Sequence, residues 1–250
     1  MSISNMGAGS YQSKVVAITG GTSGIGLALV DAFLAEGASV ITCARSGDKL
    51  ALVQQSRPGL RTVVADVTQP DGRRALINAI DSGFGRLDVF VSNAGQLIER
   101  DFAKGNLGED ELAEEFALNL VAPVQLTASV THRFPQLEAI VLVSSGYALV
   151  SPTRSPTYGA AKAGLHGFAE GLRRQLRARR VQVVEVIPPV VDTPATAHRQ
   201  VAKVPAESVA AATLSALAKR RPLALVGQTR FLPLMLRLAP RKVSEMVAKT

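Results

Sequence analysis

Tyr158 and Lys162 stand four residues apart in the stretch YGAAK. On a helix, residues with this spacing lie on one face, so a phenol and an ammonium group come close together. A free tyrosine has a pKa of about 10, and a nearby positive charge favours the ionised phenolate. The spacing therefore predicts a phenol of lowered pKa that gives or takes a proton near neutral pH. Chance also produces such pairs, so the surroundings of the pair matter.

Ser144 and Ser145 end the continuously apolar run 139–143, just before the stretch that carries Tyr158. A hydroxyl at the carboxyl end of a buried strand can hydrogen-bond a substrate carbonyl oxygen and stabilise the charge that develops on it. The alternative is a capping or turn serine, and we expect that at least one of the two has this simpler role.

The stretch TGGTSGIG, residues 19–26, directly follows the apolar run 14–18, and apolar residues resume at 27–30. Spaced glycines between a strand and a helix allow a tight turn, close approach of the backbone to a pyrophosphate and close packing of helix on strand. The free N–H groups and the positive end of the helix dipole can then bind the pyrophosphate. This stretch predicts a dinucleotide site, although such turns also occur without a ligand.

Apolar strand-like runs alternate with helical stretches along the whole chain. We predict strands at 14–19, 38–44, 61–65, 87–92, 138–144, 181–187 and 223–226, and helices at 24–36, 46–55, 71–82, 109–133, 157–179 and 205–219. Continuously apolar strands are typical of a parallel sheet that is covered on both faces. The alternation predicts an α/β fold, a doubly wound parallel sheet of about seven strands with helices on both faces, in a single domain over 14–250. Residues 1–13 are polar and small, which predicts a flexible tail.

Composition narrows the class of protein. Hydrophobic residues make up 47% of the 250 residues and charged residues 19%, which argues against disorder. No apolar run approaches the roughly 20 residues of a membrane helix, and residues 1–13 lack the apolar centre of a secretory signal. Cys43 is the only cysteine and lies in an apolar run, so we expect a buried thiol and a reducing compartment, the cytoplasm.

The net charge of +8 is carried largely by arginine, with the densest cluster at Arg173, Arg174, Arg177, Arg179 and Arg180. Such a cluster can bind nucleic acid or an anionic membrane. No recognition motif accompanies it, and arginines near the end of a helix also complement the helix dipole. We therefore favour a solvated helix face and predict no nucleic-acid partner.

These motifs together resemble the short-chain dehydrogenase/reductase family, in its single-domain branch, from about residue 14 to 226. The matching pieces stand in the family's order: TGxxxGIG at 19–26, Asp66-Val67, SNAG at 92–95, Asn119, Ser145, the Tyr158/Lys162 pair, and Pro188 with Thr193. The stretches NLVAP at 119–123, SSG at 144–146 and PPVVDT at 188–193 are similar to the branch that includes the oxidoreductase of the lipoteichoic-acid D-alanylation operon.

The resemblance implies a Rossmann fold and an oxidoreductase that interconverts a carbonyl and an alcohol by hydride transfer. In that reading Tyr158 is the proton donor or acceptor, and Lys162 lowers the pKa of Tyr158 and holds the nicotinamide ribose. Ser145, rather than Ser144, positions the substrate oxygen. Asn119 anchors a water that connects Lys162 to solvent. The alternative function is a non-catalytic NAD(P)-binding protein that senses redox state or serves as a scaffold.

The resemblance also implies the residues that contact the cofactor, and it implies no metal. They are Gly20, Thr22, Ser23, Gly24, Ile25 and Gly26 in the glycine turn, Arg45 after the second strand, Asp66 and Val67 at the adenine, Asn93, Ala94 and Gly95 on the adenosine side, and Tyr158, Lys162, Pro188, Val191 and Thr193 toward the nicotinamide. Simpler roles stay open for two of them: Asn93 can hold the central strands together, and Asp66 can be a turn residue.

The end of the second strand bears on the choice of cofactor. NAD-preferring relatives carry an acid there for the ribose 2′-hydroxyl, whereas this chain has Ala44-Arg45-Ser46. Arginine suits bidentate binding of a phosphate, and the hydroxyls of Thr22 and Ser23 can add donors. A basic residue often found just before the middle glycine of the turn is absent, since Ser23 stands there. We favour NADP(H) over NAD(H).

The last part of the chain is expected to cover the substrate. Prolines interrupt the region after residue 187, which predicts a lid-like segment at about 190–204, with an ordinary surface loop as the alternative. Residues 228–250 form an apolar, cationic extension that can close the pocket or pack at a subunit interface, which we favour, or touch a membrane surface.

Gln96, Leu97, Tyr147, Val190 and parts of 195–203 are the expected pocket residues, and they suggest a fairly hydrophobic carbonyl or alcohol substrate. By resemblance, the chain forms a homodimer or homotetramer through the helices at 109–133 and 157–179.

Overall fold

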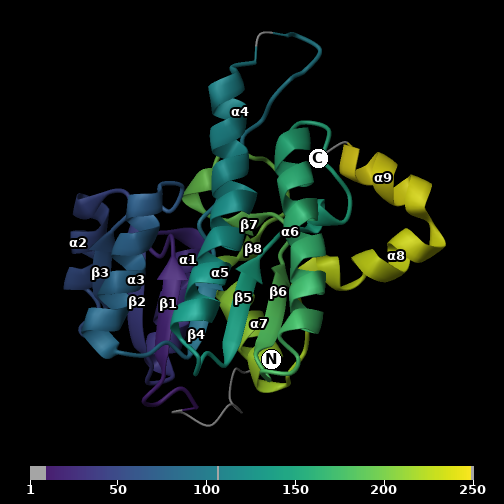
Figure 1. Ribbon diagram of the computed structural model, residues 1–250. Coiled ribbons are helices and arrows are strands. Elements are labelled where there is room, and N and C mark those ends of the chain that lie inside the picture. The colour runs from purple at the N-terminus through teal and green to yellow at the C-terminus, as the bar shows by residue number, and fades with distance from the viewer. Residues whose placement is uncertain (1–9, 106, 249–250) are drawn as a thin grey trace.

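Seven parallel strands form one sheet in the order β3-β2-β1-β4-β5-β6-β9, in a computed structural model that describes residues 10–105 and 107–248 (Figure 1). The strands are β1 Val15–Thr19, β2 Ser39–Ala44, β3 Arg61–Val64, β4 Val89–Ser92, β5 Ala139–Val143, β6 Gln182–Ile187 and β9 Leu223–Leu225. Every neighbouring pair is parallel, and each strand lies within its predicted range. The predicted doubly wound sheet of seven strands is confirmed.

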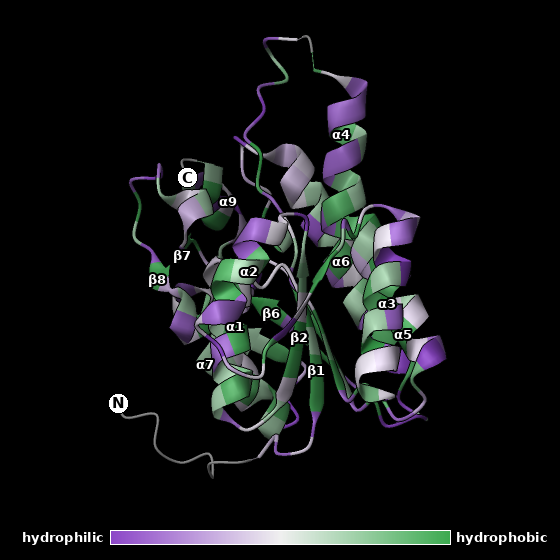
Figure 2. Ribbon diagram, turned by 90° about the vertical axis from the view of Figure 1, so that its left-hand side faces the viewer, coloured by the Kyte–Doolittle hydropathy of each residue, from purple (hydrophilic) through white to green (hydrophobic). Residues whose placement is uncertain are grey.

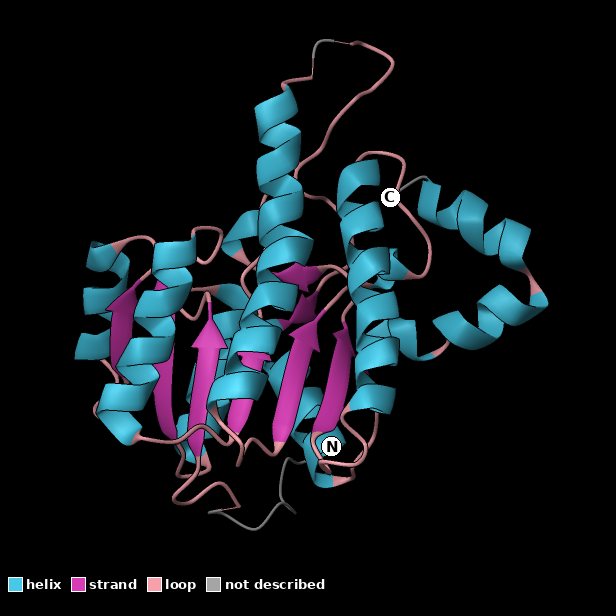
Figure 3. Cartoon of the chain, viewed as in Figure 1, coloured by secondary structure: helices cyan, strands magenta, loops and turns pink. Residues whose placement is uncertain are grey.

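Helices cover both faces of this sheet (Figure 2), and the strands run between them (Figure 3). One face carries α1 Gly24–Ala35, α2 Gly47–Gln55 and α7 Ala206–Ala218; the other carries α3 Pro70–Phe84, α5 Ala122–Arg133 and α6 Pro156–Gln175. In β1, Val16 and Ile18 enter the first core, and Val15 and Ala17 enter the second. Since successive side chains point to opposite faces, a strand covered on both sides must be apolar throughout.

The helix predicted at 109–133 is interrupted. It consists of α4 Glu109–Phe116, a π-helical turn Ala117–Val121 and α5. Pro123 has no backbone N–H to donate to the carbonyl four residues earlier, which accounts for the wider turn at this point. The turn carries Asn119, whose side chain is fully buried. α6 is also shorter than predicted: residues 176–180 form turns, and Arg180 has a φ of 58°.

The regions after β5, β6 and β9 hold short elements at the carboxyl ends of the strands. They are the 3₁₀ turns Gly146–Ala148, Pro194–Thr196 and Gly227–Arg230, and the two-residue strands β7 Val191–Asp192 and β8 Val204–Pro205, which pair with each other. The apolar extension forms two helices, α8 Leu232–Leu238 and α9 Pro240–Ala248, which project from the body of the molecule (Figure 1).

Two expectations about the surface need correction. Residues 1–9 of the predicted tail lie outside the described residues, but Tyr11 is partly buried and packs edge-on against Phe33, with ring centroids 5.0 Å apart. Arg173, in the cluster expected to be solvated, donates to the carbonyls of Val183 and Pro222 and so joins α6 to the sheet.

Cys43 is buried, as predicted. Among the described helices, none has the length and apolar character to span a membrane.

Candidate active site

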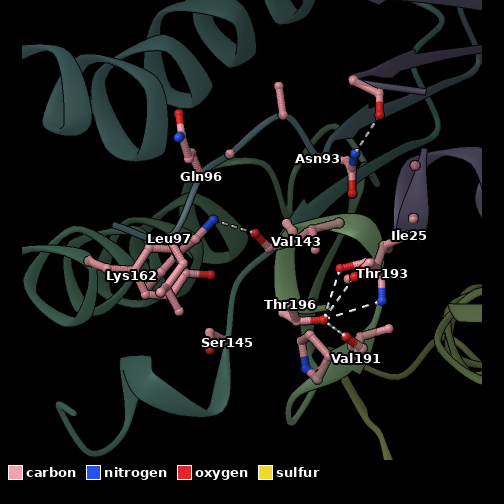
Figure 4. Close-up of a pocket in the computed structure, with 18 of the residues that line it drawn as sticks. Ile25, Asn93, Gln96, Leu97, Val143, Ser145, Lys162, Val191, Thr193 and Thr196 are labelled. Atoms are coloured by element: carbon pink, nitrogen blue, oxygen red, sulfur yellow. Dashed lines mark hydrogen bonds between the residues drawn. The ribbon is translucent and has the colours of Figure 1, made fainter. Parts of the chain in front are cut away.

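A cavity of about 1340 Å³ opens at the carboxyl ends of the strands, and its lining runs from the glycine turn to the C-terminal helices. Figure 4 shows part of this lining. Every residue predicted to bind the cofactor or to act in catalysis lines this cavity, except Asn119. The expected pocket residues Gln96, Leu97, Tyr147 and Val190 line it too, as do five residues of 195–203. The fold thus brings together side chains from widely separated parts of the sequence.

The glycine turn has the shape that a pyrophosphate needs. Gly20 and Gly24 have positive φ angles of 71° and 54°, and a Cβ at Gly26 would lie 2.1 Å from the carbonyl oxygen of Gly20. Ser23 precedes α1 without capping it through its side chain, and the first turn of α1 contains no acid. The first N–H groups of this helix are therefore available to an anion. These features fit the pyrophosphate of a dinucleotide.

The loop after β6 lies against the glycine turn. A Cβ at Gly24 would be 2.8 Å from Cγ2 of Thr193, so this glycine permits close approach of the two loops. Thr193 is held by Thr196, whose hydroxyl accepts from the Thr193 N–H at 3.3 Å (Figure 4). Pro188, at the start of the same loop, accepts from the Gly146 N–H at 2.9 Å. The pyrophosphate turn and the loop expected at the nicotinamide are therefore in contact.

Asn93 holds the central strands together. Its Nδ2 donates to the carbonyls of Thr19 and Gly20 at 2.9 and 3.2 Å, and its backbone N–H donates to Oγ1 of Thr19 at 2.9 Å. The simpler structural role is thus present, although Asn93 also lines the cavity. Sequence reasoning missed Thr42, which accepts from the Gly21 N–H at 3.0 Å and fixes the turn onto β2. No local pattern could reveal that contact, because the residues are 21 positions apart.

The end of the cavity that is expected to hold the adenine combines a turn acid with two cations. Oδ1 of Asp66 accepts from the N–H and the hydroxyl of Thr68 at 2.9 and 2.7 Å, so Asp66 organises the turn after β3. Arg45 is exposed at the same end, next to Lys49, which the sequence did not single out. Among the described residues, neither cation forms an ion pair with an acid. Both are free to meet an anionic ligand.

Ser145, and not Ser144, stands beside the tyrosine. The Ser145 hydroxyl accepts from the Tyr147 N–H at 3.1 Å and is close enough to Tyr158 to act on the pKa of the phenol. The Ser144 hydroxyl is buried without a hydrogen-bond partner among the described residues. Nζ of Lys162 donates to the carbonyl of Val143 at 2.9 Å and lies 5.6 Å from the centre of the Tyr158 ring (Figure 4).

The expected lowering of the Tyr158 pKa is wrong for the protein alone. Burial raises the pKa of Tyr158 to about 12, and the neighbouring Ser145 hydroxyl offsets only part of this rise. Burial also lowers the pKa of Lys162 to about 8, against an opposing effect of the buried carboxylate of Glu185. The ammonium group is directed at a backbone carbonyl, so desolvation dominates at the phenol. Tyr158 is therefore a neutral phenol at neutral pH.

Asn119 lies behind the cavity wall and acts on the loop after β4. Its Oδ1 accepts from the Gln96 N–H at 3.1 Å, and its Nδ2 donates to the Gln96 carbonyl at 2.9 Å and to the Glu115 carbonyl at 3.1 Å. A Cβ at Gly95 would lie 2.9 Å from Oδ1 of Asn119 and 3.4 Å from Nζ of Lys162. Asn119 thus positions the backbone that faces Lys162; the water that it is expected to hold stays a prediction.

A buried ionic cluster next to Tyr158 was missed by sequence reasoning. Nε of Arg100 donates to Oε2 of Glu115 at 3.0 Å, and Nη1 donates to Glu111 at 2.9 Å. The same Oε2 accepts from the hydroxyl of Thr157 at 2.9 Å. The cluster ties the loop after β4 to α4 and to the first turn of α6. Its members are far apart in the sequence, so only the folded chain reveals them.

The end of the cavity nearest the C-terminal helices, where the substrate is expected, is mostly apolar. It is lined by Leu97, Ile98, Val190, Val201, Phe231, Leu232, Met235, Met246 and Val247. Arg199, in the predicted lid, is 8% exposed; its Nη1 donates to the hydroxyl of Tyr147 at 3.3 Å, and its Nε lies 3.7 Å from Glu99. The segment 190–204 is thereby joined to the loops that follow β4 and β5.

Comparison with known proteins agrees with this architecture. The family model described as short chain dehydrogenase matches residues 14–203. The chain belongs to the short-chain dehydrogenase family. It is 43% identical over 186 residues to the "Uncharacterized oxidoreductase DltE" of Bacillus subtilis, and this alignment covers 72% of this chain and 73% of the relative. It is 30% identical over 191 residues to 3-oxoacyl-[acyl-carrier-protein] reductase FabG of Salmonella typhimurium, which covers 75% and 77%.

Solved structures of other short-chain dehydrogenases share the fold. One from Streptomyces avermitilis is 25% identical, with a TM-score of 0.81 over 94% of this chain and 96% of that chain. One from Burkholderia cenocepacia, in complex with NADP, is 21% identical, with a TM-score of 0.83 over 95% and 98%. This short-chain dehydrogenase is therefore an oxidoreductase with the Rossmann-like fold of its family.

The buried Lys162 makes stability depend on pH in a direction that can be measured. Its pKa of about 8 in the folded chain is below the ordinary value of 10.5, so the unfolded chain binds more protons between these values. Stability from this residue therefore rises through that pH range, by on the order of 3 kcal/mol. In urea denaturation series from about pH 7 to pH 10, the free energy of unfolding of the wild type should therefore rise relative to that of Lys162→Met.

The matched control removes a lysine that is exposed, Lys219→Met. Its unfolding free energy should follow that of the wild type across the series. Parallel pH dependences of wild type and Lys162→Met would contradict a buried, destabilised ammonium group at this position.

Proposed function

We propose that this short-chain dehydrogenase is an NADP(H)-dependent oxidoreductase that interconverts a carbonyl and an alcohol, with Tyr158 as the general acid and base. The observation that carries the proposal is the meeting of Ser145 and Tyr158 at the wall of one cavity, with the buried Lys162 behind the tyrosine ring, 5.6 Å from its centre. Two hydroxyls that meet there can both reach one substrate oxygen.

NADPH, when bound, supplies the hydride for the carbonyl carbon. Ser145 donates a hydrogen bond to the carbonyl oxygen and stabilises the negative charge that develops on it. Tyr158 gives its phenolic proton to the same oxygen. Because burial holds its pKa at about 12, the phenol carries that proton at neutral pH. Lys162, with a pKa of about 8, is mostly charged at neutral pH and stabilises the phenolate that remains. In oxidation these proton transfers are reversed.

The residues that would hold the cofactor are those of the glycine turn, the turn after β3 and the loop after β6. Arg45 supports the phosphorylated form, because it is an exposed cation at the adenine end where an acid would favour the 2′-hydroxyl. Solved relatives are described with either cofactor, NADP in one and NADH in another. A fairly hydrophobic substrate fits the apolar end of the cavity.

A coupled assay tests the proposal. Oxidation of NADPH is followed by absorbance with a panel of ketones and aldehydes of increasing chain length, and with NADH as the alternative cofactor. We expect turnover with NADPH that is greatest for apolar carbonyls. Tight binding of NADPH without turnover of any member of the panel would instead favour the non-catalytic, redox-sensing alternative. A homodimer or homotetramer, in the cytoplasm, stays a prediction.

A further inference from the structure

The C-terminal arm, which we define as residues 230–248, gathers exposed apolar side chains. Ten large hydrophobic residues are exposed in the described chain, and five of them lie on this arm: Phe231, Leu234, Met235, Leu238 and Met246. Soluble monomers seldom leave so much apolar surface in one place, and such patches mark an interaction site. In Figure 1 the arm stands away from the sheet and its covering helices, so it is accessible.

Three of these side chains form one stripe along α8 and the residue that precedes it, Phe231. Phe231, Leu234 and Leu238 follow each other at three and four residues, which places them on one helix face, and they are 63%, 58% and 74% exposed. Val243 of α9 is buried by contrast, at 1% exposed. The two helices thus pack through other residues and leave the stripe without a partner in the described chain.

Cations flank the stripe. Arg230, Arg237, Arg241 and Lys242 are exposed, and none of them forms an ion pair with a described residue. Glu245 is the only acid of the arm. The arm therefore combines an apolar stripe with unneutralised positive charge.

The arm also forms part of the cavity mouth. Phe231, Met235 and Met246 line the cavity and are at the same time exposed to solvent, at 63%, 38% and 51%. The apolar surface is therefore continuous from the substrate end of the cavity to the outside of the arm. An apolar molecule that moves along this surface into the cavity would stay in contact with apolar side chains until it reaches Ser145 and Tyr158.

We propose that the C-terminal arm docks this enzyme on an anionic lipid bilayer surface, with the cavity mouth turned toward the lipid. The stripe enters the boundary between headgroups and acyl chains, and the flanking cations contact anionic headgroups. Charge complementarity selects this partner over a second copy of the same face, since two arms in contact would bring their cations together at a cost in free energy. The proposal goes beyond the reaction itself and does not depend on it.

Cosedimentation of the full-length protein with vesicles tests the stripe. Wild type is expected to bind vesicles of phosphatidylcholine mixed with phosphatidylglycerol, and to bind phosphatidylcholine alone far more weakly. The double change Leu234→Glu and Leu238→Glu should weaken binding at least about tenfold, because it removes two apolar side chains and adds like charge to the anionic surface. Leu52→Glu is the matched control, since Leu52 is 65% exposed on α2 and should bind as the wild type does.

A second pair of variants tests the cations. Arg237→Gln with Arg241→Gln should weaken binding roughly 30-fold, and added salt should weaken the binding of the wild type in the same direction. Arg177→Gln with Arg221→Gln removes two exposed arginines away from the arm and should leave binding unchanged. NADPH affinity, measured on each variant by fluorescence, reports whether the Rossmann fold is intact.

Three outcomes would overturn the proposal. The first is a wild type that does not bind anionic vesicles at low salt. The second is an equal loss of binding in the matched controls, which would indicate a non-specific effect of net charge. The third is a wild type that does not bind vesicles and is oligomeric by light scattering, while the Leu234→Glu and Leu238→Glu variant is monomeric. The arm would then be a subunit interface. None of these outcomes bears on whether NADPH reduces a carbonyl.

Discussion

Tyr158→Phe is expected to lower kcat for carbonyl reduction by about 10²- to 10⁴-fold, the range for loss of a general acid. The change deletes only the hydroxyl, on whose pKa the neighbouring Ser145 acts and which is the proposed source of the proton. The ring that faces Lys162, with its centre 5.6 Å from Nζ, stays in place. NADPH affinity, measured by fluorescence titration, should therefore stay close to that of the wild type.

Tyr11→Phe is the matched control for this variant. Tyr11 packs against Phe33 on the outside of the sheet, remote from the cavity, so the loss of its hydroxyl should leave kcat unchanged. A Tyr158→Phe enzyme with the turnover of the wild type would remove Tyr158 from the mechanism. A Tyr158→Phe enzyme that loses both NADPH binding and turnover would instead mean that the hydroxyl acts on the cofactor site and not on proton transfer.

The sheet could be predicted from the sequence because each strand is apolar on both faces. A run such as 139–143 has no polar alternation, and the sheet buries both of its faces under helices. The same logic places the site, since the carboxyl ends of parallel strands meet at one edge of the sheet. Thr19, Ser92 and Val143 end three neighbouring strands there, so the residues that follow them were expected to converge.

The parts that could not be predicted depend on contacts between distant residues. The π-helical turn follows from one missing N–H at Pro123, and helical periodicity alone does not detect it. The cluster of Arg100, Glu115 and Thr157 joins three separate elements. The pKa of Tyr158 was expected to fall because Lys162 is near in sequence, but the distance between the two groups and the burial of the phenol decide its direction. Spacing indicates which groups meet, and packing determines their charge.

Arg45→Gln is expected to weaken NADPH binding roughly 10- to 100-fold, since hydrogen bonds between charged groups contribute about 1.5–3 kcal/mol each. NADH affinity should change little, because NADH has no 2′-phosphate for the guanidinium to bind. Arg45 is exposed and lacks an ion pair among the described residues, so its removal leaves no acid uncompensated. Binding of the two cofactors is measured separately, by titration calorimetry of wild type and variant.

Two further variants separate a specific contact from a general effect of charge. Lys49→Gln removes the other cation at the adenine end, and a smaller selective loss for NADPH would show that it supports Arg45. Arg177→Gln removes one charge far from the cavity and should leave both affinities unchanged. Equal losses for NADPH and NADH in Arg45→Gln would contradict a phosphate role, because only the 2′-phosphate distinguishes the two ligands. The ratio of the two affinities therefore tests cofactor choice independently of any substrate.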